Sequence, residues 1–143
     1  MTVDNILRIK GRDVVTIEPD RTLAEAARLL SERKIGAVIV SDTFRPVSGI
    51  LSERDIVRAV AKRGAAALEE PVSRSMTEKV VTCTAHSGIN DLMEMMTAGK
   101  FRHIPVVEGG NLAGIVSIGD IVKHRLAEVE AETRAMRDYI ATA

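Results

Sequence analysis

Hydrophobic residues in the first half of the chain follow first a helical and then an extended pattern. The residues with helical spacing are Leu23, Ala26, Ala27 and Leu30. They share one face of a helix, because neighbours on a helix face lie three or four residues apart. Thr22 and Glu25 form a capping box where this stretch begins. The pattern therefore predicts a helix that continues to about Arg33.

Two short runs rich in β-branched residues come next. The runs Ala37–Val40 and Val47–Leu51 are separated by a polar segment. Runs of this length and composition are typical of paired strands around a loop. Ser52 follows the second run directly and is expected to open a second helix.

A nine-residue motif in the first half returns 65 residues later. Gly49-Ile-Leu-Ser-Glu-Arg-Asp-Ile-Val57 is matched by Gly114-Ile-Val-Ser-Ile-Gly-Asp-Ile-Val122. Two upstream segments also recur, at an offset of 66 residues: Val14–Thr16 with Val80–Thr82, and Lys34–Val38 with Lys100–Ile104. An internal repeat of this period indicates a duplicated structural unit.

The second half is expected to repeat the elements of the first. The predicted elements are a strand near Val80–Thr84, a helix over about Gly88–Ala98, strands Ile104–Glu108 and Leu112–Val116, and a helix from Ile118 to about Tyr139. Gly109-Gly110-Asn111 supplies the turn between the two later strands. Each half therefore runs strand, helix, strand, strand, helix.

The predicted fold class is α/β, of the α+β type, with two β-α-β-β-α units packed together. A unit of about 60 residues is marginal as an isolated core, so the halves should pack on each other. The first unit, with the N-terminal segment, is expected to span residues 1–70, and the second, with its extended final helix, residues 71–143. That helix is charged over most of its surface and should be solvated or brace a dimer.

Composition and charge exclude several classes of partner. Twenty basic residues balance twenty acidic ones and form no basic run, which argues against nucleic acid and anionic membranes. No stretch of about 18 apolar residues occurs, and Met1–Lys10 has no apolar signal core, so we expect a cytoplasmic protein. Cys83 is the single cysteine and has no Cys or His at metal-ligand spacing, so no metal site is predicted.

The polar residues of the repeated motif lie at two strand-to-helix junctions. Ser52 and Ser117 stand where backbone N–H groups and the helix dipole favour an anion. Asp55 and Asp120 follow three residues later, and each carboxylate can accept both hydroxyls of a ribose. The structural alternative is an N-cap with an acidic first turn, worth about 1 kcal/mol. For either copy alone, the cap is the favoured interpretation.

The repeated pattern Gly-h-h-Ser-x-x-Asp-h-h, where h is hydrophobic, resembles the CBS domain, named for cystathionine β-synthase. The resemblance covers about Val14 to Leu126. Lys100–Val107 also resembles the second strand of this family, and Met76-Thr77 the short lead-in that precedes a repeat. The resemblance implies two repeats packed about a pseudo-twofold axis, with AMP, ATP, NAD or S-adenosylmethionine bound in two clefts between them.

The family pattern assigns residues of this chain to the two clefts, each with the Ser-x-x-Asp of one repeat and strand residues of the other. The first cleft would contain Ser52, Asp55, Val81, Thr82, Arg102, His103, Ile104 and Pro105. The second cleft would contain Ser117, Asp120, Val15, Thr16, Ile35, Gly36 and Ala37.

The two clefts differ in charge. Arg102 can hold a phosphate with two donors and His103 can add a third, whereas Gly36 and Ala37 offer only backbone at the matching positions. We expect tighter phosphate binding in the first cleft. Without the family resemblance, Arg102 and His103 would more simply be surface residues paired with carboxylates.

The sequence predicts a non-catalytic regulatory module that senses an adenine nucleotide. The expected ligand is AMP, ADP, ATP, NAD(H) or S-adenosylmethionine, with no required cofactor. The expected partners are a second copy of the chain, in the flat dimer that the family forms, and a separate regulated protein. The alternative is a dimerisation scaffold without a ligand. No catalytic motif of the common hydrolases, P-loop enzymes or dinucleotide-binding enzymes is present, so no enzyme activity is expected.

Overall fold

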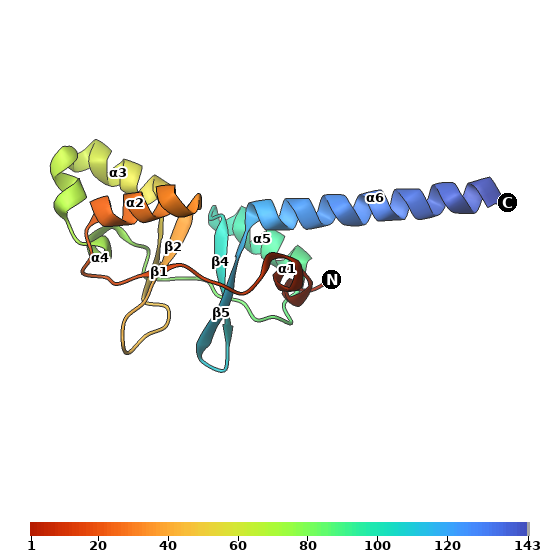
Figure 1. Cartoon of the computed structure of the whole chain (residues 1–143), viewed down its shortest axis with the longest axis horizontal. Coiled ribbons are helices and arrows are strands. Elements are labelled where there is room, and N and C mark those ends of the chain that lie inside the picture. Colours follow the sequence, from red (N-terminus) through yellow and green to blue (C-terminus); the bar gives the residue numbers. More distant parts are fainter. Residues whose placement is uncertain (143) are drawn as a thin grey trace.

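The computed structural model describes residues 1–142 and has the mixed helix and strand content of an α+β chain (Figure 1). In chain order the elements are α1 (Val3–Lys10), β1 (Thr16–Ile17), α2 (Leu23–Arg33), β2 (Ala37–Val40), β3 (Gly49–Ser52), α3 (Glu53–Arg63), the 3-10 helix η1 (Ala65–Glu69), α4 (Val72–Ser75), α5 (Ile89–Gly99), β4 (His103–Glu108), β5 (Asn111–Ser117) and α6 (Ile118–Thr142). The predicted order of elements is confirmed except for the strand near residues 80–84, and α1, η1 and α4 are additions that the sequence analysis missed.

The strands form one small sheet in each half. In the first, β2 lies between β1, which is parallel to it, and β3, which is antiparallel. In the second, β4 pairs antiparallel with β5. The strand predicted over residues 80–84 is shorter than expected, because only Cys83 pairs with β4, by a parallel bridge to Val106. Residues before Cys83 leave the sheet, and Val80 and Val81 instead line a cavity.

The helix ends show the same repeat at the level of the backbone. The Thr22 hydroxyl accepts a hydrogen bond from the Glu25 N–H at 3.2 Å, so the predicted cap of α2 is present. Helix α2 ends at Lys34 and α5 ends at Lys100, and both lysines adopt the left-handed conformation, with φ of 55° and 56°. The two lysines occupy equivalent positions, and each turn leads into the strand that approaches the other half.

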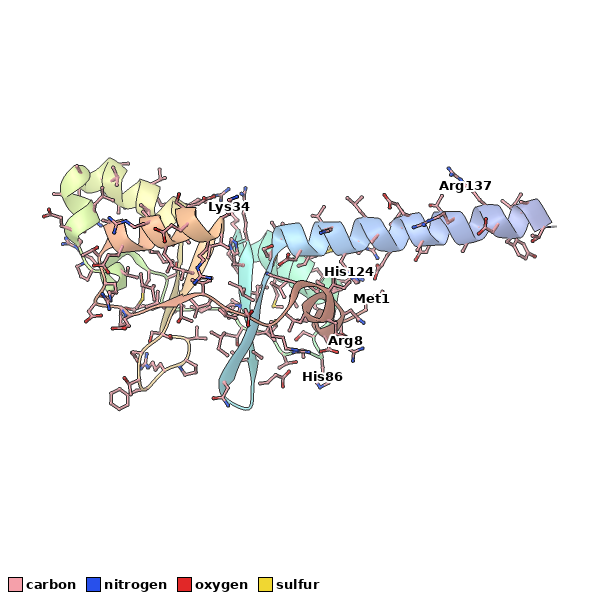
Figure 2. The ribbon with its side chains drawn as sticks, in the orientation of Figure 1. Met1, Arg8, Lys34, His86, His124 and Arg137 are labelled. Carbon is pink, nitrogen blue, oxygen red and sulfur yellow. The ribbon has the colours of Figure 1, made fainter. Side chains whose placement is uncertain are left out.

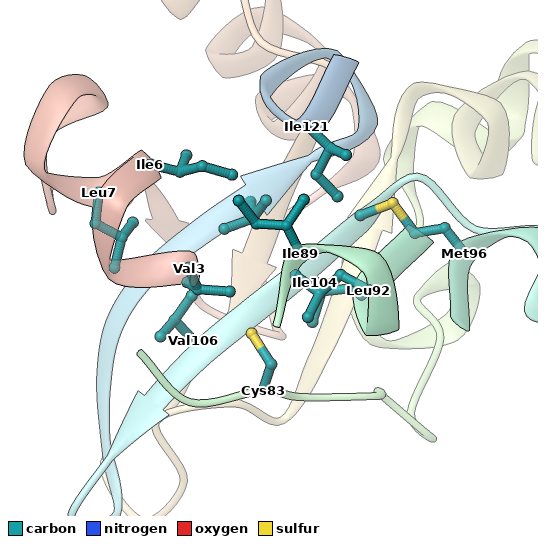
Figure 3. Close-up of a cluster of buried hydrophobic side chains, with 11 residues drawn as sticks. Val3, Ile6, Leu7, Cys83, Ile89, Leu92, Met96, Ile104, Val106 and Ile121 are labelled. Carbon is teal, nitrogen blue, oxygen red and sulfur yellow. The ribbon is translucent and has the colours of Figure 1, made fainter. Parts of the chain in front are cut away.

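The hydrophobic residues form two cores, one in each half. The first core consists of Ile17, Leu23, Ala26, Leu30, Val38, Val40, Leu51, Ala59, Ala67 and Val72. The second consists of Val3, Ile6, Leu7, Cys83, Ile89, Leu92, Met96, Ile104, Val106, Val116 and Ile121. Figure 3 shows the side chains of Val3, Ile6 and Leu7 on α1 directed toward the strands and Ile121 of the second half. The segment that precedes the first repeat thus completes the core of the second.

The lead-in segments of the two repeats pack on the glycines that begin the repeated motif. A β-carbon on Gly114 would lie 2.8 Å from a methyl group of Leu7. A β-carbon on Gly49 would lie 2.7 Å from the Met76 sulfur and 2.8 Å from the Thr77 carbonyl oxygen. Separations this short are steric clashes. Gly49 therefore requires glycine, because the Thr77 carbonyl is backbone, whereas a side chain at Gly114 would require Leu7 to shift. The division of the chain at residue 70 stays a prediction. In the structure, the lead-in of each repeat packs on the other repeat.

Helix α6 extends well beyond the second half. Its 25 residues span about 37 Å, and Figure 1 shows the C-terminal part projecting away from the rest of the chain. Residues from Val129 onward are exposed on every side. Among residues 1–142, no helix is both long enough and apolar enough to cross a membrane.

We predict that Gly49→Ala lowers the free energy of unfolding by about 1 to 3 kcal/mol, because the added methyl group meets a backbone carbonyl that cannot rotate away. Gly119→Ala is the matched control, since a β-carbon there would lie no closer than 3.6 Å to its nearest neighbour, the Ser117 hydroxyl. Urea unfolding of both variants measures the difference. Equal stabilities would contradict the packing described.

Candidate ligand-binding site

Equivalent backbone contacts tie the first turns of α3 and α6 to the segments that precede β2 and β4 within the same half. The Glu53 N–H donates to the Gly36 carbonyl at 3.0 Å, and the Ile118 N–H donates to the Arg102 carbonyl at 2.8 Å. Gly36 and Arg102 occupy matching positions of the repeat. These bonds place the start of each helix beside the start of β2 or β4.

Ser52 and Asp55 form a reciprocal cap at the start of α3. Asp55 Oδ2 accepts from the Ser52 N–H at 2.8 Å and from the Ser52 hydroxyl at 3.1 Å, and the Ser52 hydroxyl accepts from the Asp55 N–H at 3.3 Å. The structural alternative from the sequence is therefore present. The other carboxylate oxygen, Oδ1, lies 3.8 Å from a guanidinium nitrogen of Arg58 and takes no part in the cap.

Ser117 and Asp120 repeat this cap, with a cation added. Asp120 Oδ2 accepts from the Ser117 N–H at 2.9 Å, and the Ser117 hydroxyl accepts from the Asp120 N–H at 3.1 Å. Lys10, at the end of α1, donates to the same Oδ2 at 2.6 Å and to the Ile115 carbonyl at 2.8 Å. Burial raises the pKa of Asp120, but the bonds from Lys10 and Ser117 outweigh it and hold that pKa below its ordinary value.

A cavity of about 760 Å³ lies between the two halves and includes both junctions. Its lining residues are Gly36, Ile50, Ser52, Glu53, Arg54, Asp55, Arg58, Thr77, Lys79, Val80, Val81, Gly99, Lys100, Phe101, Arg102, His103, Ser117, Ile118 and Gly119. Five of these side chains are cationic and two are carboxylates, although the whole chain has a formal charge of zero. The cavity therefore gathers positive charge from a neutral chain, which favours an anionic ligand.

The structure brings together most of the residues predicted for the first cleft. Those that line the cavity are Ser52, Asp55, Val81, Arg102 and His103. Thr82 is exposed beside the cavity and does not line it. Ile104 belongs to the second core, because it lies on the opposite face of β4 from His103. Pro105 is buried and does not line the cavity.

The residues predicted for the second cleft are dispersed. Gly36 and Ser117 line the same cavity as the first set. Thr16 lines a separate depression of about 360 Å³ beside α2. Val15 and Ile35 pack against the first core and Ala37 is buried. Asp120 is bonded to Lys10, so the carboxylate predicted to hold a ribose already has a cationic partner.

His103 lies where the two halves meet. A β-carbon on Gly36 would lie 3.6 Å from its ring and 3.7 Å from the Glu53 carboxylate. Burial is the main cause that lowers the pKa of His103 below its ordinary value of 6.5; Lys10 and Arg102 also lower it, while Asp120 and Glu53 act in the opposite direction. The imidazole is therefore neutral at pH 7 and offers one donor and one acceptor.

Several residues of the site were missed by the sequence analysis. Lys79, Lys100 and Arg58 line the cavity and supply much of its charge. Arg58 lies three residues after Asp55, and Lys79 directly precedes a predicted strand. Their positions in the sequence could therefore have indicated that they lie near the site. Lys10 had none, because its contact with Asp120 joins residues 110 positions apart.

Both halves of the chain match a known family. A model described as the CBS domain matches residues 6–62 and again residues 72–127. The crystal structure of the CBS-domain containing protein ATU1752 from Agrobacterium tumefaciens is 54% identical, with a TM-score of 0.85 over 87% of this chain and 99% of that chain.

Two further relatives extend the comparison. The CBS domain-containing protein CBSX3, mitochondrial, of Arabidopsis thaliana is 29% identical over 147 residues, which is 97% of this chain and 71% of the relative. The CBS domain pair of protein MJ0100 is 22% identical, with a TM-score of 0.80 over 90% of this chain and 98% of that chain, and shares the fold.

We predict that the free energy of unfolding falls as the pH is lowered below 6.5, with part of the fall due to His103. A histidine with a lowered pKa stays neutral in the folded chain while the unfolded chain takes up a proton, so acid favours unfolding. Asp4, Asp42 and Asp120, whose pKa values lie below 3.8, act at more acidic pH.

Urea unfolding between pH 7.5 and 5.5 tests this prediction. His103→Asn should flatten the dependence on pH, whereas His86→Asn, at an exposed position, should keep the slope of the parent chain. An unchanged slope in His103→Asn would contradict the prediction.

Proposed function

The chain belongs to the CBS domain family, and on this premise we propose that it is a non-catalytic regulatory module that binds an adenine nucleotide in the first cleft. The observation that carries the proposal is the cavity itself. It joins a ribose-competent carboxylate, Asp55, to a cluster of cationic side chains at the interface of the two repeats.

The cavity has a separate feature for each part of a nucleotide. Asp55 Oδ1 is available to accept the ribose hydroxyls, since the helix cap uses only Oδ2. Arg102 and Lys79 are placed to bind phosphate, and Arg102 can do so with two parallel donors. Ile50, Val80 and Val81 give an aliphatic surface for the adenine ring, whose burial is worth about a few kcal/mol.

The charge of the cavity favours phosphorylated ligands within the adenosine class. The structure of the MJ0100 domain pair is in complex with 5′-methylthioadenosine and S-adenosyl-L-methionine, so adenosine compounds bind this fold in that protein. Neither compound carries a phosphate. Five cationic side chains favour AMP, ADP, ATP or NAD(H) over both of them here.

The two junctions should differ in affinity, with the first dominant. Lys10 is bonded to the Asp120 carboxylate at 2.6 Å and offsets its negative charge. Among residues 1–142, Asp55 has one cationic partner, Arg58 at 3.8 Å. The Lys10–Asp120 pair is partly exposed and contributes about 1 kcal/mol at most, so it weakens the second site rather than closing it.

A ligand-free scaffold is the second candidate function. It is favoured by one observation, namely that both Ser-x-x-Asp motifs are satisfied as helix caps without any ligand. In that case the motif would act only on helix stability. The two functions differ in whether a nucleotide stabilises the fold, because a ligand that binds only the folded chain raises the free energy of unfolding by RT ln(1 + [L]/Kd).

Thermal unfolding with AMP, ADP, ATP, NAD, NADH and S-adenosylmethionine tests the proposal. We expect at least one phosphorylated ligand to raise the midpoint temperature of unfolding. At a ligand concentration of 100 times Kd, the free energy of unfolding should rise by about 2.7 kcal/mol. Asp55→Ala should abolish the ligand-induced rise, and Asp120→Ala, the matched control, should retain it. Each variant is compared with itself without ligand, since both lose a cap worth about 1 kcal/mol. No rise with any ligand would favour the scaffold.

The role of Arg102 gives a separate prediction. Arg102→Ala should weaken AMP binding about 10- to 100-fold, because a charge-assisted hydrogen bond contributes about 1.5 to 3 kcal/mol. Binding of adenosine, which has no phosphate, should change little. Arg33→Ala is the control, since Arg33 ends α2 and does not line the cavity. Calorimetric titration measures the affinities of the two variants for AMP and for adenosine, each compared with the parent chain. Equal losses for AMP and adenosine in Arg102→Ala would contradict a phosphate contact.

Regulation requires that the bound nucleotide change the affinity of the chain for a partner. The partner would be a separate protein or a second copy of the chain. A cytoplasmic location also stays a prediction.

A further inference from the structure

Helix α6 carries a stripe of apolar residues, interrupted at Thr133, that stays exposed in the structure of residues 1–142. Its members are Val122, Leu126, Val129, Met136 and Ile140, which are 50%, 59%, 48%, 63% and 67% exposed. With Thr133 they are spaced by four, three, four, three and four residues. The stripe spans about 27 Å along the helix. Exposed apolar residues in such a regular row indicate a surface that packs against another helix.

The opposite side of α6 faces the second half of the same chain. Ile121 is fully buried there, and the side chains of His124 and Glu128 are 10% and 13% exposed. Figure 2 shows His124 at the base of the helix and Arg137 far out on its projecting part. The intramolecular contact therefore uses one side of the helix and leaves the stripe open.

The spacing of the stripe is that of a heptad repeat. In the heptad abcdefg, the a positions are Leu126, Thr133 and Ile140, and the d positions are Val122, Val129 and Met136. A period of seven residues keeps a and d in contact with a partner when two helices supercoil to the left. Apart from Tyr139 at a g position, the large apolar residues of 122–140 occupy a and d. Such a narrow seam suits two strands.

The charged residues beside the seam specify the partner and its direction. The g positions include Arg125 and Glu132, and the e positions include Glu130 and Arg137. In a parallel pair of identical helices each g residue meets the e residue five positions later on the other helix. Arg125 then meets Glu130, and Glu132 meets Arg137. Both contacts join opposite charges, and the symmetry of the pair produces each of them twice.

An antiparallel pair of the same helices would join like charges. When the two seams overlap fully, e residues face e residues and g residues face g residues. Lys123 would face Arg137, Glu130 would face Glu130 and Glu132 would face Glu132. Like charges at these positions oppose pairing. Among the described residues, Glu130, Glu132 and Arg137 take part in no ion pair, so they are available for contacts between chains.

We propose that residues 122–140 of α6 form a parallel two-stranded coiled coil with the same helix of a second copy of this chain. The coil is independent of the nucleotide site, since neither its seam nor its charged flanks line the cavity. It would fix two modules at the same end of one coil. Arg125, which now bonds Glu128 of its own helix at 2.8 Å, would exchange or share that contact.

Disulfide trapping in the full chain tests the register. Thr133→Cys places a thiol at an a position, where a parallel pair brings the two equivalent residues together. Ala131→Cys is the matched control, at an equally exposed f position on the outer side. The native Cys83 is buried, and burial raises the pKa of its thiol to about 11, so it does not compete.

Under mild oxidation, Thr133→Cys should form a dimer of twice 15.5 kDa at least tenfold faster than Ala131→Cys. Equal rates of crosslinking would overturn the proposal. So would a parent chain that is monomeric by light scattering at about 50 μM, where a dimer with a micromolar dissociation constant would be mostly associated. A trapped species larger than two chains would also overturn the two-stranded arrangement.

A charge exchange tests the orientation independently. Glu132→Arg alone should raise the dissociation constant of the dimer about fivefold to tenfold, because two attractive contacts become repulsive. Adding Arg137→Glu restores the opposite charges and should return the constant to the parent value. In an antiparallel pair the single variant would keep like charges face to face, so an unchanged constant would contradict the proposal. Circular dichroism checks that both variants keep their helix content.

Discussion

The close packing of each lead-in segment on the opposite repeat is the constraint on which the rest of the structure depends. Leu7 reaches the position where Gly114 has no side chain, and Met76 does the same at Gly49. Gly49 begins β3, which ends at Ser52, and Gly114 lies within β5, which ends at Ser117. Each lead-in therefore packs three residues before a functional junction. A larger residue at either glycine would displace a segment that also borders a cleft.

This packing makes two copies of one motif chemically different. On the first repeat, the segment after Met76 continues through Lys79 to Val81 and lines the cavity beside Asp55. On the second, the segment is helix α1, whose last residue, Lys10, lies on Asp120. Both aspartates cap a helix through Oδ2, but of the two only Asp120 has a lysine bonded to its carboxylate, at 2.6 Å, whereas Asp55 has Arg58 at 3.8 Å. The duplication thus gives one dominant site rather than two equal ones, because the two lead-ins differ in sequence.

The sequence predicted the parts of the fold that depend on local pattern. The β-branched strands in the first half, the 65-residue repeat, the α+β class and the family are confirmed. Of the capping box at Thr22, the bond from the Glu25 N–H to the Thr22 hydroxyl is present. Helix α1 was missed although Val3, Ile6 and Leu7 have helical spacing, because one turn of apolar residues in a charged segment is a weak signal. The strand at residues 80–84 was overestimated, because β-branched composition does not reveal that Val80 and Val81 turn toward a cavity.

The residues of the candidate site were harder to predict from the sequence, because tertiary contacts determine which of them come together. Alternation along β4 could have separated His103 from Ile104, but nothing local indicates that Lys10 meets Asp120 across 110 residues.

A crystal structure of the chain grown with AMP tests the central claim most directly, since that claim is that one motif binds the nucleotide more tightly than its copy. We expect the ribose hydroxyls on Asp55, the phosphate beside Arg102, and Lys10 still bonded to Asp120. A nucleotide bound at Asp120 with Lys10 displaced and the Asp55 junction empty would contradict it.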